Sequence, residues 1–163
     1  MNMKKGFTLI ELLIVIALLG ALAVGLLATI DPFEQLKKGR DTSLRNTLSE
    51  FYNANLRYYS TKGQFPWVGA TSGYLNTMTG SVISTLVAAG ELKNRFADLA
   101  GTGNLAKIYL SSPTAENIST CFRPESKAFQ IDPNTVYDQS GGTSISTCNG
   151  AGTGTDACWY CIQ

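Results

Sequence analysis

The sequence contains no histidine, and this absence limits the chemistry that the chain can perform. Histidine is the commonest general base at neutral pH and a frequent metal ligand. The sequence also shows no phosphate-binding loop and no pairing of a nucleophile with a base. An enzyme is therefore the least favoured class of protein for this chain, and no cofactor is predicted.

Charge is scarce and nearly balanced, with 13 Lys and Arg against 12 Asp and Glu in 163 residues. Without a basic patch, nothing in the sequence indicates a nucleic-acid partner. Cysteine is absent before residue 120, and the four that follow suit an oxidising compartment. The composition agrees with one small exported domain and an anchor.

The longest stretch without charge runs from Leu12 to Ile30 and follows Lys4, Lys5 and Glu11. As a helix it would span about 28 Å, close to the ~30 Å hydrocarbon core of a bilayer. The two lysines would hold its start on the cytoplasmic side. The segment predicts a single membrane helix.

Glu11 is the anomaly in this helix, because a carboxylate there costs free energy and an ordinary anchor gains nothing from it. It has a use if the chain is cut between Gly6 and Phe7. The α-amine of Phe7, largely protonated at neutral pH, then lies one helical turn from the carboxylate. Glu11 would neutralise that amine in its own chain or in a neighbouring subunit.

The run KKGFTLIELLIV, residues 4–15, resembles the class III leader of type IV pilins and type II secretion pseudopilins. The resemblance implies cleavage by prepilin peptidase after Gly6, N-methylation of Phe7 and a role for Glu11 in subunit docking. It also implies self-association into a filament, contact with membrane lipid before assembly, and a pilus assembly platform as a partner. The implied location is the cytoplasmic membrane first and an extracellular filament afterwards.

Two other interpretations of this segment are a secretory signal peptide and a plain membrane anchor. Residues 21–23, Ala-Leu-Ala, satisfy the small-x-small cleavage rule but lie inside the apolar run. A plain anchor leaves Gly6 and Glu11 unexplained. The predicted organisation is a leader over residues 1–6, an apolar helix over 7–31 and a head over 32–163.

Asp31 and Pro32 are predicted to break the N-terminal helix into two parts. Pro32 has no N–H and its ring clashes with the preceding turn. The same residues suit a new helix start, with Asp31 as N-cap, Pro32 at N1 and Glu34 at N3. The second helix would run to about Lys62. Its predicted apolar face consists of Leu44, Leu48, Phe51, Tyr52, Leu56 and Tyr59.

The remaining chain predicts a short helix and then a small sheet. The helix would run from Ser81, as N-cap, to Gly90. Period-two patterns indicate strands over Ala106–Ser111, Ile118–Pro124 and Lys127–Asp132, joined as an antiparallel meander. The predicted fold is α+β: a long two-part N-terminal helix, an apolar anchor and then an amphipathic half, packed on a small antiparallel sheet with a disulfide-stapled C-terminal loop.

Four cysteines permit three pairings. Cys121–Cys161 together with Cys148–Cys158 is preferred, because Cys121 alone lies outside the tail and a long closed loop constrains the unfolded chain most. A zinc site would need two closely spaced pairs, and only Cys158 and Cys161 form one. A redox motif would need a helix after that pair, and only two residues follow.

A calcium site is an alternative interpretation of Asp132, Asn134 and Asp138, which occupy positions one, three and seven of a calcium-like loop. The loop lacks the central glycine and the late glutamate of an EF-hand. Because Asp-Pro-Asn is also an ordinary turn, no metal is predicted.

The sequence thus predicts a structural subunit of a type IV pilus-like surface filament. The cysteine-bearing tail resembles a pilin's disulfide-bounded loop more than a pseudopilin's compact end. A type II secretion pseudopilin remains an alternative, as does a membrane-anchored binding module that never polymerises.

Overall fold

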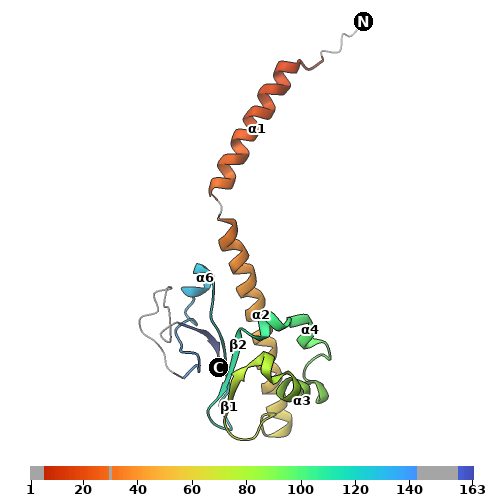
Figure 1. Cartoon of the computed structure of the whole chain (residues 1–163), viewed down its shortest axis with the longest axis vertical. Coiled ribbons are helices and arrows are strands. Elements are labelled where there is room, and N and C mark those ends of the chain that lie inside the picture. The colour runs from red at the N-terminus through yellow and green to blue at the C-terminus, as the bar shows by residue number, and fades with distance from the viewer. Residues whose placement is uncertain (1–5, 30, 143–157) are drawn as a thin grey trace. The chain divides into compact units, whose positions relative to one another are not determined.

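The computed structural model describes residues 6–29, 31–142 and 158–163 (Figure 1). The chain forms two compact units, residues 1–35 and 36–163. The first contains the apolar helix α1, Leu9–Thr29, and the second contains a head built around most of helix α2, Pro32–Lys62. The α+β fold class predicted from the sequence is confirmed.

The predicted break between the two N-terminal helices is present. Helix α1 ends at Thr29 and α2 begins at Pro32. Asp31 caps the second helix, since its Oδ1 accepts hydrogen bonds from the backbone N–H groups of Phe33 at 3.1 Å and Glu34 at 3.2 Å. These are donors that the first turn of a helix cannot satisfy internally, which is why an aspartate stands before the proline.

Helix α2 buries one face against the head. Leu44, Leu48 and Phe51 are fully buried, as predicted. Leu56, predicted on the same face, is instead 40% exposed. The buried row advances by about 3.6 residues per turn and passes through Asn55, one position and about 100° away from Leu56.

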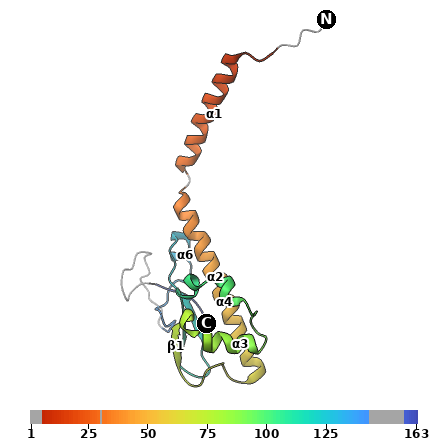
Figure 2. The same ribbon diagram turned by 45° about the vertical axis from the view of Figure 1, so that its right-hand side comes forward.

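The head contains a four-stranded antiparallel sheet in the order β1-β2-β3-β4, which lies beside α2 in both Figure 1 and Figure 2. The strands are β1 Thr71–Tyr74, β2 Ile108–Ser112, β3 Ser119–Phe122 and β4 Tyr160–Ile162. The register aligns Tyr74, Tyr109, Cys121 and Cys161 across all four strands. Because side chains alternate along a strand, the neighbouring row of Ile108, Phe122 and Tyr160 is buried in the core.

Short helices connect these strands and cover the core. They are the 3₁₀ turn Leu75–Met78, the π turn Thr79–Ile83, α3 Ser84–Ala88, α4 Phe96–Ala100, α5 Thr102–Leu105 and α6 Lys127–Gln130. The helix predicted from Ser81 is therefore present but starts six residues earlier, at Leu75. The Ser81 hydroxyl donates a hydrogen bond to the carbonyl oxygen of Met78 at 3.4 Å. Ser81 therefore lies inside the helical stretch and does not act as an N-cap.

The strand predicted over Lys127–Asp132 is wrong, because this segment forms helix α6. The hydroxyl of Ser126 accepts a hydrogen bond from the backbone N–H of Phe129 at 3.4 Å and caps one helical turn. A single buried residue, Phe129, gives that turn its packing contact. Strands β1 and β4 were not predicted, and both depend on long-range pairing with β2 and β3.

Candidate functional site

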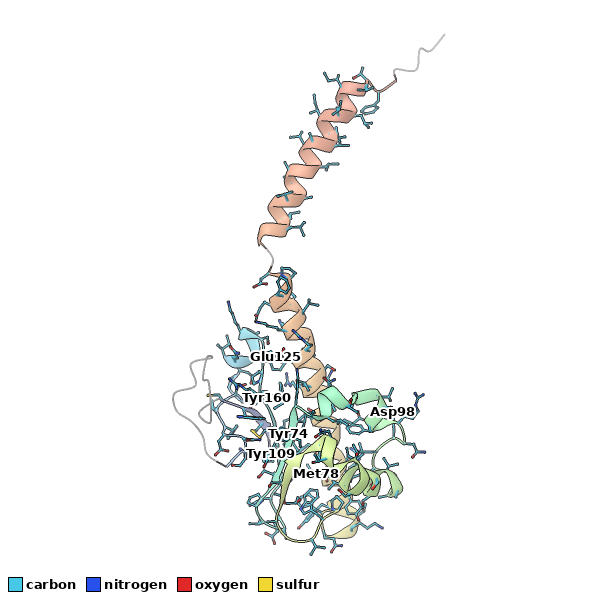
Figure 3. The ribbon with its side chains drawn as sticks, viewed as in Figure 1. Tyr74, Met78, Asp98, Tyr109, Glu125 and Tyr160 are labelled. Atoms are coloured by element: carbon cyan, nitrogen blue, oxygen red, sulfur yellow. A yellow bond between two sulfur atoms is a disulfide. The ribbon has the colours of Figure 1, made fainter. Side chains whose placement is uncertain are left out.

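The apolar helix α1 is the feature of the N-terminal unit that needs a partner. Every large apolar side chain from Leu9 to Leu27 is at least 46% exposed. Figure 3 shows side chains projecting from both sides of this helix in the view drawn. Residues Leu9–Leu27 are long and apolar enough to cross a membrane, and fully burying each large side chain is worth about 1.5–3 kcal/mol. This helix therefore requires either lipid or other protein around it.

Thr8 and Glu11 form a capping box at the start of α1. Glu11 Oε2 accepts hydrogen bonds from the Thr8 backbone N–H at 2.9 Å and from the Thr8 hydroxyl at 2.8 Å. The Thr8 hydroxyl accepts in turn from the Glu11 N–H at 3.3 Å. Reciprocal bonds of this kind satisfy backbone donors that the first helical turn leaves open.

The capping box corrects the expectation that an ordinary anchor gains nothing from Glu11. The carboxylate caps the first turn of α1 as well as carrying a charge. The spacing Thr-x-x-Glu in residues 8–11 was the sequence signal for this capping box. Both bonds from Thr8 go to one oxygen, so they orient the carboxylate without occupying Oε1. Glu11 is exposed, within reach of a second partner.

The predicted cleavage point lies just before this box. Gly6 is exposed, Phe7 is 84% exposed, and neither residue belongs to α1. The bond between Gly6 and Phe7 is thus accessible and outside a helix, as cleavage by a peptidase would require. Lys4 and Lys5, the other predicted elements of the leader, lie outside the described residues.

The predicted disulfide between Cys121 and Cys161 is present in the head. It joins β3 to β4 at directly opposed positions of the register, across 40 residues of sequence. Gly141, at φ 73°, lies against Ser119 so closely that a side chain there would collide with it. Residues around Gly141 therefore cover the face of the sheet that holds the disulfide.

The second predicted disulfide falls partly outside the described residues. Cys158 is disulfide-bonded. Cys148 lies in the segment 143–157, outside the described residues, so the pairing Cys148–Cys158 stays a prediction. No free cysteine is found in the described part of the chain.

The residues of the alternative calcium site form turns. Asp132 Oδ1 accepts from the backbone N–H of Asn134 at 2.9 Å. Asp138 Oδ1 accepts from the N–H and the hydroxyl of Ser140, at 2.9 and 2.6 Å, and from the N–H of Gly142 at 3.2 Å. Among the described residues no group of three or more His, Cys, Asp and Glu is placed to hold a metal ion. The geometry favours the ordinary-turn interpretation.

A buried carboxylate that the sequence analysis missed ties α2 to the segment between β3 and α6. Asp41 is 0% exposed and accepts hydrogen bonds from the N–H groups of Glu125 and Ser126 and from the Ser126 hydroxyl, at 2.6–3.1 Å. The signal was its spacing, since Asp41 precedes Leu44 by three residues on the buried face. A carboxylate on such a face must find donors when it is buried.

Comparison with known proteins agrees with this arrangement. Residues 1–27 match the prokaryotic N-terminal methylation motif. Over 111 residues the chain is 36% identical to the fimbrial protein EcpC of Eikenella corrodens, a match that covers 63% of this chain and 67% of that protein. No solved structure matches the chain.

The chain thus combines an exposed apolar N-terminal helix, long enough to cross a membrane, with a folded head. A capped helix break separates the two helices, and a disulfide bond joins two strands of the head. With the methylation motif and the fimbrial relative, these features identify the family. The chain belongs to the type IV pilin family.

Proposed function

We propose that this protein is the structural subunit of a type IV pilus-like surface filament. It is made with a leader over residues 1–6, cleaved after Gly6 by prepilin peptidase, N-methylated on Phe7 and polymerised through α1. The observation that carries the proposal is the helix itself, apolar along its length and exposed along its length. The membrane surrounds it before assembly, and neighbouring copies of α1 surround it in the filament core.

In this proposal, Glu11 of one subunit forms an ion pair with the N-terminus of an adjacent subunit. Thr8 holds one oxygen of the carboxylate, and the second oxygen meets the α-amine that cleavage creates on Phe7 of an adjacent subunit. In a low-dielectric helix bundle this ion pair is much stronger than it is in water. An unmatched carboxylate in the bundle is costly, so the pair also selects the correct axial register.

The experiment compares the variants Glu11→Ala and Glu11→Gln with the parent chain. Glutamine retains the capping-box acceptor but not the charge, so it separates the two roles of Glu11. We expect both variants to remain in the membrane fraction and both to lose most sheared surface filaments. The matched control is Asp98→Ala, which removes a carboxylate from the surface of the head, where the Asp98 side chain is 74% exposed.

Full filament yield from Glu11→Gln would show that charge pairing does not drive assembly. If the parent chain itself stays in the membrane and appears in no filament, the result would favour the non-polymerising binding module. A filament confined to the periplasm would favour the type II secretion pseudopilin.

A further inference from the structure

The Cys121–Cys161 disulfide lies on the face of the sheet opposite the aromatic core, because side chains alternate along β3 and β4. Yet neither cysteine is open to solvent on that face, since Cys121 is 0% exposed and Cys161 is 4% exposed. Residues 138–142, a short segment that we call the strap, lie against both cysteines there. The contacts of the strap therefore bear on how the disulfide is reached.

The strap approaches both sulfur atoms of the disulfide. Cys161 Sγ lies 3.7 Å from the carbonyl oxygen of Asp138. Gly141 is buried against Ser119, whose hydroxyl lies 3.3 Å from Cys121 Sγ. A Cβ atom added at Gly141 would collide with the Ser119 side chain and lie 3.4 Å from Cys121 Sγ. With its φ of 73° as well, this position suits glycine alone, and glycine lets the strap come this close to the disulfide.

Hydrogen bonds give the strap its own shape and attach it to the sheet. Asp138 Oδ1 accepts the three hydrogen bonds from Ser140 and Gly142 described above, which fold the strap into a turn. The side-chain amide of Gln139 donates to the hydroxyl of Tyr74 on β1 at 3.0 Å. Ser140 and Gly142 are exposed, so the outer side of the turn faces solvent. Lifting this turn from the sheet would break the bond to Tyr74 and leave the aromatic core in place.

We propose that the strap controls access to the disulfide, so that a thiol reaches Cys121 and Cys161 only when residues 138–142 lift from the sheet. In the exchange reaction a thiolate attacks one sulfur and expels the other as a thiolate, which leaves a mixed disulfide. The second thiolate of a dithiol reagent then attacks that mixed disulfide, and the reagent leaves as a cyclic disulfide. Two electrons pass to the cysteines, whose thiolates take up protons from water.

Unfolding of the whole head is the other route by which a thiol could reach the buried sulfurs. The two routes differ in how much surface is exposed before the attack. Lifting a short turn exposes little surface, so its free energy depends only weakly on urea, whereas global unfolding depends on urea with the full slope. The strap belongs to the head and acts with or without polymerisation, so this proposal does not rest on the filament proposed above.

The test is the rate at which dithiothreitol reduces the disulfide in the full-length chain in detergent micelles. Timed alkylation and peptide mapping assign the freed thiols to Cys121 and Cys161. Gly141→Ala should speed their release by about tenfold or more, because the added Cβ atom opposes closure of the strap. The matched control is Gly69→Ala, since Gly69 also has a φ of 73° but a Cβ atom there meets nothing within 4 Å. We expect this control to leave the rate unchanged.

A milder variant and the urea dependence complete the test. Gln139→Ala removes the bond to Tyr74 without touching the core and should speed reduction by about threefold or more. Its control, Gln64→Ala, removes the same amide from an exposed position after α2 and should have no effect. In the parent, the rate should rise only weakly with urea below the unfolding transition. A rise with the full slope of global unfolding, or a rate that Gly141→Ala and Gln139→Ala leave unchanged, would overturn the proposal.

Discussion

Thr8 decides how Glu11 is presented, because it donates two hydrogen bonds to the same carboxylate oxygen. In the proposed filament, the capping acceptor and the docking charge are the same side chain, so a single substitution of Glu11 removes both. Replacing Thr8 tests the cap while keeping the charge.

Thr8→Ala should destabilise the first turn of α1 by about 1 kcal/mol, the usual cost of losing an N-cap hydroxyl. We expect filament yield to fall partially, and by less than in Glu11→Ala, because the carboxylate remains. Thr8→Ser restores the hydroxyl and should restore the yield. The measurement is sheared filament per subunit in the membrane fraction, and a loss in Thr8→Ala as deep as that in Glu11→Ala would assign the defect to capping.

Asp41 joins α2 to the segment between β3 and α6 through buried hydrogen bonds. Asp41→Ala leaves one buried backbone donor, one part-buried backbone donor and one buried hydroxyl without their acceptor. We expect a loss of about 3 kcal/mol in the free energy of unfolding. Ser126→Ala, which removes only the hydroxyl, should cost about 1 kcal/mol.

Urea unfolding of the full chain in detergent, followed by near-ultraviolet circular dichroism, measures both losses. Thr42→Ala is the control, since Thr42 is the exposed neighbour of Asp41 on the same helix. Equal stability of Asp41→Ala and Thr42→Ala would contradict the account.

Glu125 makes the stability of the head depend on pH. The hydrogen bond from Lys107 lowers the pKa of Glu125, burial opposes this, and the charges of Lys107, Arg40 and Lys37 lower it further. A carboxyl whose pKa is lowered on folding contributes stability above its unfolded pKa of about 4.3 and loses it as pH falls through the folded value.

Glu125→Gln should therefore reduce the melting temperature at pH 7 and flatten its decline below about pH 4.3. The effect is expected to be small, under ~1 kcal/mol, because the side chain is 34% exposed and solvent screens the pair. Melting curves from pH 3 to 8 give the comparison. A parent and variant that lose stability in parallel below pH 4.3 would rule out this contribution.

At the scale of elements, the long helices and the strands β2 and β3 were predictable from the sequence, and the strands β1 and β4 were not. The helix α2 is 31 residues long, and its sequence carries a periodic apolar pattern, a proline at the first position and a lysine followed by glycine at the end. These signals were enough to predict it. Strand β1 consists of Thr-Ser-Gly-Tyr, which is typical of a loop, and becomes a strand only because β2 lies beside it. Alternation in Lys127–Asp132 indicated a strand, but the local cap from Ser126 formed a helical turn instead.

The same limit applies to the site. The motif in residues 4–15 is local, so the sequence was enough to predict the N-terminal segment. A surface groove of the head is lined by Lys37, Lys107, Arg123 and Trp159, which come from four separate segments, and no local pattern brings them together. Their meeting depends on the strand order, which the sequence predicted only in part.

Strand β4 packs in the core of the head, whereas the sequence predicted only a disulfide-stapled C-terminal loop there. Tyr160 is 2% exposed and packs against Phe122 and Phe129, with ring centroids 5.3 and 6.0 Å away, and the Arg45 guanidinium lies 5.5 Å from the centre of its ring. The disulfide from Cys161 to Cys121 secures this strand. Its loss is therefore expected to loosen the aromatic cluster as well as the C-terminal segment.

The double substitution Cys121→Ser and Cys161→Ser should lower the free energy of unfolding by roughly 2–4 kcal/mol. Hydrogen exchange should accelerate first at Tyr160 and Cys161 and then at Phe129, while the buried turns of α2 around Leu48 stay protected. Exchange at Phe129 as slow as in the parent would show that β4 is an appendage and not part of the core.

For the whole molecule, we propose that this chain becomes a filament subunit through cleavage after Gly6. The proposal rests on the apolar surface of α1, which a membrane would cover before assembly and other copies of the helix would cover in the filament. The capping box explains how a charge is tolerated at the start of that helix. In the proposed filament the disulfide-bonded head would face outward.

The most direct test is the intact mass of the subunit in filaments sheared from cells that express this chain. The account predicts one species that begins at Phe7, carries one N-methyl group, and contains two disulfides. A chain that still begins at Met1 or begins inside α1, or filaments that contain none of this chain, would contradict it.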